Sequence, residues 1–175
     1  GEGGSNSATI ALARRVAINN SVEFRNVVVE VAEQPFVEGI DGLIGPALFS
    51  QFLITLNGPR NVLELAPHRG EEDGADFRPM RRLDHLLLVE DRSSGEPLQL
   101  VVDTGASYSV AHETVPSLND ETVHLIGVSG MTSVTKANMP LKFNLAGLSC
   151  WTRETVSADL SQISDHFGVQ ISAFL

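Results

Sequence analysis

The chain has 175 residues, of which 42% are hydrophobic, enough to form the core of one globular domain or of two small ones. Its 22 acidic and 12 basic side chains give a net charge of −10, which argues against nucleic acid or an anionic membrane surface as a partner. No apolar stretch reaches the length of a membrane span, and the single cysteine, Cys150, excludes an internal disulfide.

The first third of the chain predicts a β-rich region. Apolar and polar side chains alternate along 9–19 and 22–31, which predicts a hairpin and a long strand. Paired apolar residues between glycines predict a strand and a tight loop over 36–45, and Pro46 is placed to begin a short helix. Two further apolar runs flank Asn-Gly-Pro-Arg at 57–60, which is typical of a hairpin turn.

The segment 68–78 has no hydrophobic periodicity and gathers charge and glycine, the composition of a solvated linker. We therefore expect a domain boundary here, between a region 1–67 and a region 79–175. Four acidic side chains lie in the segment, but their spacing matches no calcium-binding pattern. The histidines of the chain also lack metal-ligand spacing, so we expect no metal site.

After the linker, 83–90 predicts a strand, 91–97 a turn, and 98–102 a second strand that leads directly into Asp103. The run 98–102 has strand length and ends in β-branched residues, as in a strand covered on both faces. Burying an unpaired carboxylate is costly. Asp103 is therefore expected to be hydrogen-bonded within the turn or kept for chemistry.

Small residues follow this acid. Thr104 offers a hydroxyl that can lock the turn, Gly105 lets backbone amides approach the carboxylate, and Ala106 leaves room in front of it. The turn therefore predicts a presented oxygen ligand. The alternative interpretation is an Asx-type turn that ends a core strand.

Residues 101–107, Val-Val-Asp-Thr-Gly-Ala-Ser, resemble the active-site signature of the aspartic proteases, and the alanine after the glycine is closer to the retropepsin type than to the pepsin type. The resemblance implies an all-β fold of retropepsin-like acid-protease barrels with short helices. It also implies an endopeptidase without a cofactor, with Asp103 as catalytic acid and base and with Thr104 and Gly105 holding it. The same resemblance favours an extracytoplasmic or periplasmic location.

A second segment resembles another part of the same family. Residues 40–45, Ile-Asp-Gly-Leu-Ile-Gly, are similar to the hydrophobic-hydrophobic-glycine segment that supports the catalytic loop late in each lobe. This implies that 1–67 is the C-terminal part of one lobe and that 79–175 is a second lobe, cut just before its own supporting segment. Two alternatives stay open: residues 40–52 fold back to support the Asp103 turn, or they form an ordinary strand-to-helix connection.

The segment 122–135 predicts two strands joined by a glycine-flanked tip. At this distance after the catalytic turn, such a hairpin resembles the flap that closes over a bound peptide in these enzymes. The resemblance implies that Gly127, Ser129 and Gly130 contact substrate together with Ala106. A plain hairpin is the alternative.

The remaining sequence predicts strands over 141–145 and 148–156. Ser157 is placed to cap a short helix near 160–163, and an apolar segment follows at 167–175.

Hydrolysis by aspartic proteases requires two carboxylates that share a proton around one water molecule. Only one Asp-Thr-Gly occurs here, so the second carboxylate is expected from a symmetric homodimer or from another lobe. Thr104 would then reach across to the other turn. The other aspartates lack the small-residue context and are expected to be surface or turn residues: Asp41, Asp84, Asp91, Asp120, Asp159 and Asp165.

Other reaction classes fit less well. Residues 127–130, Gly-Val-Ser-Gly, are not a Gly-x-Ser-x-Gly elbow, which argues against a serine hydrolase. The prediction is therefore an aspartic endopeptidase acting on a peptide or protein substrate. The alternatives are a catalytically inactive protease-like module that binds peptide or serves as an interaction scaffold, and a plain β scaffold in which Asp103 only ends a strand.

Overall fold

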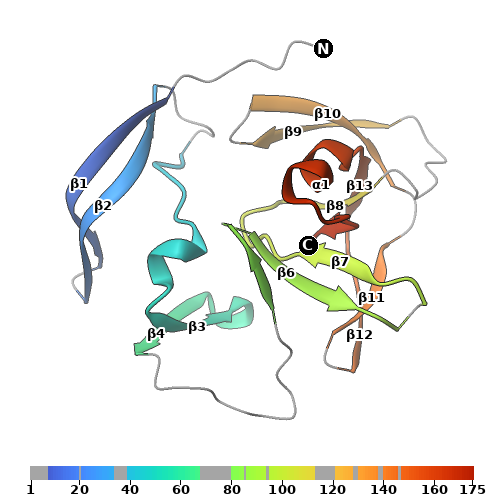
Figure 1. Ribbon diagram of the computed structural model, residues 1–175, viewed down its shortest axis with the longest axis horizontal. Coiled ribbons are helices and arrows are strands. Elements are labelled where there is room, and N and C mark those ends of the chain that lie inside the picture. The colour runs from blue at the N-terminus through green and yellow to red at the C-terminus, as the bar shows by residue number, and fades with distance from the viewer. Residues whose placement is uncertain are drawn as a thin grey trace. The chain divides into compact units, whose positions relative to one another are not determined.

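The computed structural model describes residues 8–19, 21–33, 39–67, 80–84, 86–93, 95–112, 121–127, 130–137, 140–145 and 147–175. Within these ranges the chain forms fourteen β-strands, two short 3-10 helices and one α-helix (Figure 1). The prediction of an all-β fold is confirmed. The chain divides into two compact units, Gly1–Leu43 with His124–Ser133 and Ile44–Val123 with Val134–Leu175. The expected linker 68–78 lies outside the described residues, so the domain boundary placed there stays a prediction.

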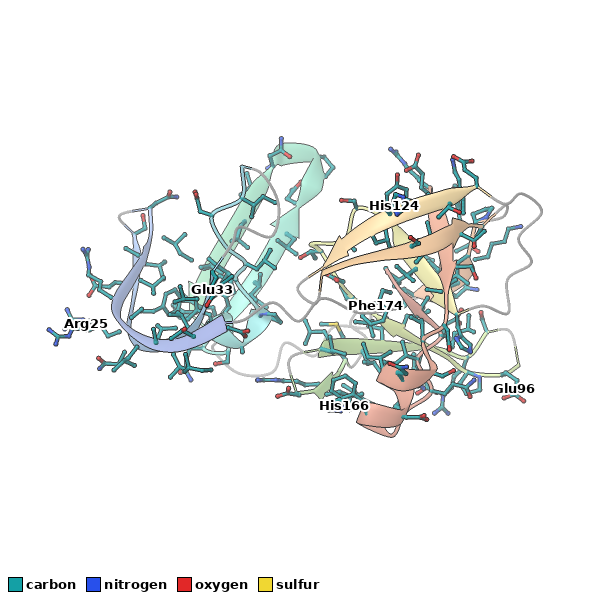
Figure 2. All side chains as sticks on the ribbon, turned by 90° about the horizontal axis from the view of Figure 1, so that it is seen from above. Arg25, Glu33, Glu96, His124, His166 and Phe174 are labelled. Carbon is teal, nitrogen blue, oxygen red and sulfur yellow. The ribbon has the colours of Figure 1, made fainter. Side chains whose placement is uncertain are left out.

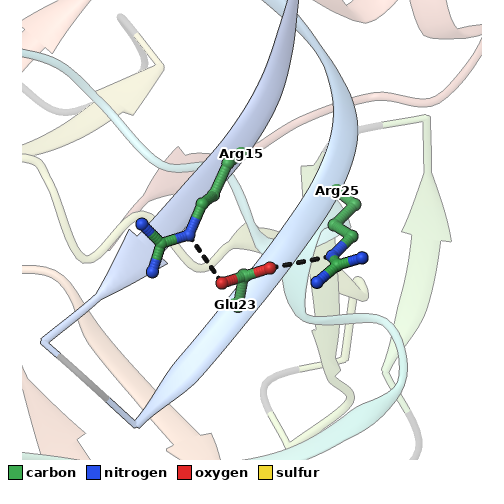
Figure 3. A network of polar contacts seen from close by, with 3 residues as sticks. All are labelled: Arg15, Glu23 and Arg25. Carbon is green, nitrogen blue, oxygen red and sulfur yellow. Dashed lines mark hydrogen bonds and ion pairs between the residues drawn. The ribbon is translucent and has the colours of Figure 1, made fainter.

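The first unit contains an antiparallel hairpin of β1 (Ala8–Ile18) and β2 (Val22–Ala32), as the alternating pattern predicts. Near the turn between the two strands, Glu23 of β2 accepts hydrogen bonds from the Nε atoms of Arg15 and Arg25, at 2.6 and 2.8 Å (Figure 3). These bonds, first from Arg15 and then from Arg25, hold the pKa of Glu23 below its ordinary value. The two arginine side chains are well exposed and that of Glu23 is 34% exposed, so this network adds little to stability.

In the second unit, the 3-10 helix η1 (Pro46–Phe49) begins at Pro46 as predicted. Of the strand and tight loop predicted over 36–45, residues 39–45 form no strand, and residues 36–38 lie outside the described residues, so the strand stays a prediction. Gly39 has a φ of +81°, a left-handed conformation that a regular strand does not contain. Three glycines in seven residues make an extended strand costly to order here.

The hairpin of β3 (Phe52–Asn57) and β4 (Val62–Pro67) follows η1 and forms as predicted. Its turn is the 3-10 helix η2 (Gly58–Arg60), where the Asn57 side chain accepts the backbone N–H of Arg60 at 3.3 Å. Turn chemistry that is local in sequence therefore determines this element.

The largest element is an eight-stranded sheet in the order β5-β6-β7-β14-β8-β13-β10-β9 (Figure 1). Its strands are β5 (Arg81–Leu83), β6 (Leu86–Asp91), β7 (Leu98–Val101), β14 (Ala173–Phe174), β8 (Ser109–His112), β13 (Thr155–Ala158), β10 (Gly130–Lys136) and β9 (Thr122–Gly127). The strands β6 and β7 are the two that the sequence predicts before Asp103.

The C-terminal strand β14 lies between β7 and β8, parallel to the first and antiparallel to the second. Ala173 is opposite both Leu100 and Ala111, and all three side chains are fully buried. Phe174 follows among the packed side chains of this unit (Figure 2). The strand β7, which leads to Asp103, therefore has β6 and β14 as its neighbours. The segment 40–52, which one open alternative folds back to support the Asp103 turn, is not beside it.

The buried core has two parts because neighbouring residues on a strand face opposite sides of the sheet. One part is buried beneath the helix α1 (Ser161–Phe167), and the other beneath the hairpin of β11 (Lys142–Leu145) and β12 (Leu148–Trp151). The two clusters consist of Leu88, Val101, Leu160 and Ile171, and of Val89, Leu100 and Ala173. The strand before Asp103 is thus covered on both faces, as predicted.

Two predicted details near the end of the chain are wrong. The strand expected over 148–156 is two strands, β12 and β13, because Thr152 leaves the sheet and its hydroxyl accepts the backbone N–H of Leu141 at 2.9 Å. Ser157 lies in β13 and does not cap the helix. Instead, the carboxylate of Asp159 accepts the N–H of Ser161 at 2.9 Å as α1 begins.

Helix α1 has seven residues and is tied to β8, since the N–H of Leu160 donates to Nδ1 of His112 at 3.1 Å. In the described part of the chain, no helix has the length and apolar character needed to cross a membrane.

Candidate functional site

The backbone before the Asp103 turn is held from both sides. The N–H of Val102 donates to the carbonyl of Leu87 on β6 at 2.8 Å. The N–H of Asp103 donates to the carbonyl of Leu175 at 2.9 Å, just beyond β14. Leu175 in turn donates to the carbonyl of Val101 at 2.8 Å. The point at which the chain leaves the sheet is therefore determined by strands on both sides.

After this point, backbone N–H groups of the turn donate hydrogen bonds to Asp103 itself. The N–H of Gly105 donates to Oδ1 of Asp103 at 3.0 Å, and the N–H of Ala106 donates to the Asp103 carbonyl at 3.2 Å. A Cβ at Gly105 would lie 3.4 Å from the same Oδ1. The absence of a side chain at residue 105 therefore keeps an apolar group away from the carboxylate.

The residues of the turn, Asp103 to Ala106, are exposed. Only Oδ1 of Asp103 accepts a hydrogen bond from a described residue, so Oδ2 is open to solvent or to a ligand. The Gly105 bond is that of an Asx turn. An Asx turn and a presented carboxylate, which the sequence poses as alternatives, are therefore present together.

The hydroxyl of Thr104 makes no hydrogen bond with any residue in the described ranges, so it does not lock the turn there. The hydroxyl is thus available to a group outside the described chain.

A shallow, open pocket of about 390 Å³ begins at this turn. Its lining comes from the segment after the turn and from the connection between β12 and β13: Ala106, Ser107, Tyr108, Ser109, Arg153 and Glu154. The two segments meet because β8 and β13 pair in parallel, with Ser109 opposite Thr155. The N–H of Ser109 also donates to the Glu154 carbonyl at 3.1 Å. Of this lining, the sequence predicts only Ala106, since pairing between distant strands has no local signal.

The predicted flap residues that the structure describes belong to a different unit of the chain from Asp103. Gly127 ends β9 and Gly130 begins β10, and both belong to the first unit, whereas Asp103 belongs to the second. Ser129 lies outside the described residues. The two strands are linked by a contact of 3.0 Å between Nδ1 of His124 and Oγ of Ser133, and His124 is labelled in Figure 2. A flap over Asp103 stays a prediction.

Asp91 corrects one expectation. The sequence predicts it at the surface or in a turn, but its side chain is only 3% exposed. Its Oδ1 accepts the N–H of Ser93 at 2.8 Å, and its Oδ2 accepts the N–H of Asn144 on β11 at 2.7 Å. Burial raises the pKa of Asp91, but the hydrogen bonds from Ser93 and Asn144 outweigh burial and bring the pKa below its ordinary value. Asp91 is thus a structural acid that joins two hairpins.

In the described ranges, no group of three or more His, Cys, Asp or Glu residues is arranged to hold a metal ion. Comparison with protein-family models finds no match to this chain, and comparison with curated proteins finds none of significance.

Proposed function

We propose that this chain is a retropepsin-like aspartic protease region, an endopeptidase that hydrolyses peptide bonds through a water molecule activated by Asp103 and a second aspartate. The observation that carries the proposal is the state of the Asp103 carboxylate. One oxygen is oriented by the N–H of Gly105, and the other is exposed at the end of a strand whose backbone is held on both sides. Such a carboxylate is rigidly placed and still free to react.

The topology around the turn supports the proposed acid-protease barrel. A short strand, β14, is inserted between the strand that precedes Asp103 and the strand that follows it. This insertion supplies the partner that both strands need at the point where the turn interrupts their pairing.

In the proposed reaction, Asp103 and its twin share one proton, because two like charges in contact do not both ionise. The ionised carboxylate takes a proton from water as the water oxygen bonds to the scissile carbonyl carbon. The protonated carboxyl group gives its proton to the carbonyl oxygen. The C–N bond then breaks as the amine nitrogen takes the proton that the first carboxylate had received from water, and one hydroxyl of the diol returns a proton to the other carboxylate, which yields a carboxylic acid and an amine and restores the shared proton.

The second aspartate is proposed to come from a second copy of this chain or from another lobe. Two features of the turn leave room for such a twin: the exposure of Asp103 and the hydroxyl of Thr104, which makes no hydrogen bond with a described residue. In a symmetric pair, each Thr104 hydroxyl can donate to the opposite turn. The flap role of Gly127, Ser129 and Gly130 and the division into regions 1–67 and 79–175 belong to the same proposal, as does an extracytoplasmic setting.

Peptidase activity at acidic pH tests the proposal. We expect cleavage of an unstructured protein substrate, inhibition by a pepstatin-type transition-state analogue, and loss of cleavage in Asp103→Asn. The matched control is Asp165→Asn, which makes the same chemical change at an exposed position on α1. Cleavage that survives Asp103→Asn would contradict the proposal. Analytical ultracentrifugation of the active sample then tells whether the twin comes from a second copy.

A specific observation supports a second candidate, a protease-like module that binds peptide without cleaving it. Only one Asp-Thr-Gly turn occurs in this sequence, and one such turn supplies only half of the required pair of carboxylates. Peptide binding without turnover, in both monomer and any dimer, would favour this function over the first.

A further inference from the structure

The pocket beside the Asp103 turn contains chemistry that the proposed hydrolysis does not use. It begins at Ala106, whose N–H donates to the carbonyl of Asp103 at 3.2 Å, and extends to Arg153 and Glu154. A peptide held over the Asp103 carboxylate would pass this pocket within a few residues of the cleaved bond. The pocket is therefore positioned to contact a side chain of the substrate.

Arg153 is the cationic residue of the pocket lining. Its side chain is exposed and forms no ion pair with a residue in the described ranges. A guanidinium group presents several N–H donors in a planar fork that matches the two oxygens of a carboxylate. Ser107 and Ser109 line the same pocket, and serine hydroxyls are further potential donors.

Glu154 provides an opposing charge in the same lining. Its backbone carbonyl is used by the N–H of Ser109, but its carboxylate forms no ion pair with a residue of the described chain. Substitution of its side chain therefore leaves the backbone contact in place. Glu154 repels the anions that Arg153 attracts. Neutralising the two side chains should therefore change the affinity for an anionic ligand in opposite directions.

We propose that this pocket is a substrate subsite for a carboxylate of a bound peptide, either an Asp or Glu side chain or a free C-terminus, with Arg153 as its binding residue. The inference rests on the proposed function only for the nature of the ligand, a peptide. The net charge of −10 works against acidic ligands at long range. A preference for a carboxylate would therefore report the local contact with Arg153.

Fluorescence anisotropy on the Asp103→Asn background, where peptide is not consumed, tests the subsite. Three labelled peptides are compared that differ only at one internal residue and at the C-terminus. The first has an internal Glu and an amidated C-terminus. The second has Gln in place of Glu and an amidated C-terminus, and the third has Gln and a free C-terminus. We expect a carboxylate peptide to bind about fivefold to tenfold more tightly than the neutral one, the range for an exposed charge-assisted contact. The peptide that shows the gain identifies the source of the carboxylate.

Substitutions then assign the effect to the pocket. Arg153→Gln should abolish the preference, and Glu154→Gln should increase it by about twofold to fivefold, as expected when a weakly screened repulsion is removed. Arg60→Gln, which removes an exposed arginine from the turn between β3 and β4, should leave all three affinities unchanged. Equal binding of the three peptides, or a preference that survives Arg153→Gln, would overturn the subsite.

A parallel cleavage assay with Asp103 intact separates the two proposals. Cleavage without any carboxylate preference in binding or in product sites overturns the subsite and leaves the protease function. A carboxylate preference that depends on Arg153, in a chain that never cleaves, supports the subsite and overturns the endopeptidase in favour of the peptide-binding module.

Discussion

Two aspartates lie at opposite ends of the ladder formed by β6 and β7, and they differ in what their oxygens contact. Asp91 ends β6, is buried, and accepts a backbone N–H on each carboxylate oxygen. Asp103 follows β7, is exposed, and accepts a backbone N–H from the described residues on one oxygen only. The first connects the hairpin β6–β7 to β11, whereas the second presents an oxygen to the outside.

The two sites differ in how much hydrogen-bonding capacity each carboxylate keeps. A buried carboxylate whose oxygens are all satisfied stabilises the folded state and has no capacity left for a substrate. An exposed carboxylate on a rigid backbone has less effect on stability and can still accept a proton from water. The two sites should therefore respond in opposite ways when each acid is removed.

The largest expected effect is on catalysis at Asp103. Asp103→Asn keeps an oxygen for the Gly105 N–H but removes the proton acceptor, so we expect activity to fall by about 10³-fold or more. The free energy of unfolding should stay within about 0.5 kcal/mol of the parent, as for other exposed positions. Cleavage rates and urea denaturation of the same preparations measure both. A large loss of stability in this variant would mean that Asp103 is a structural acid like Asp91.

Asp91→Ala should show the reverse pattern. It leaves the N–H groups of Ser93 and Asn144 without their buried acceptor, which should cost about 3 kcal/mol of unfolding free energy. Asp103→Ala, the matched change at the exposed acid, should cost about 0.5–1 kcal/mol, the value of one turn hydrogen bond. Urea midpoints compare the two variants. Equal losses would remove the distinction between the two sites.

The success of sequence-based prediction in this chain depends on how far apart the interacting residues lie. The alternating segments that form β1, β2, β3 and β4 carry their own pattern, and Asn57 to Arg60 carry their own turn chemistry. The Asp103 turn is equally local, because the apolar strand, the acid and the small residues are contiguous. The amino-acid pattern of each segment is therefore sufficient to predict these elements.

The failures involve partners that are distant in sequence. Asp91 is wrongly predicted at the surface because its acceptor role depends on Asn144, 53 residues later. The insertion of β14 between β7 and β8 brings Gln99 to Ser172, 73 residues apart, and no local pattern encodes that pairing. Arg153 and Glu154 reach the Asp103 turn only through the parallel pairing of β8 with β13.

Acid should weaken the Asp91 site by a smaller amount than its removal does. The pKa of Asp91 in the folded protein is lowered from its ordinary value of 3.8, which is the value in the unfolded chain. The stabilisation that ionised Asp91 contributes is therefore fully present above pH 3.8 and is lost as the pH falls through the lower pKa of the folded protein. Protonated Asp91 still offers a carbonyl oxygen, so the loss is partial. Urea denaturation from about pH 6 to about pH 2 should show a steeper decline in the parent than in Asp91→Asn. Parallel declines would mean that other carboxylates carry the acid dependence.

The smallest expected effect is at Gly105. A substitution here changes the surroundings of the Asp103 carboxylate and leaves the carboxylate itself in place. A methyl group at this position would lie 3.4 Å from Oδ1 of Asp103, close enough to displace water from the carboxylate without a steric clash. We therefore expect Gly105→Ala to lower kcat by about threefold to tenfold, since the methyl group hinders the approach of water to the carboxylate that accepts its proton. The stability should change by less than about 1 kcal/mol, because an added methyl meets no other atom of the described residues within 4 Å. Steady-state kinetics of the variant and of the parent under the same conditions measure kcat. An unchanged kcat would mean that the close approach of the Gly105 amide serves only the turn, as in any Asx turn.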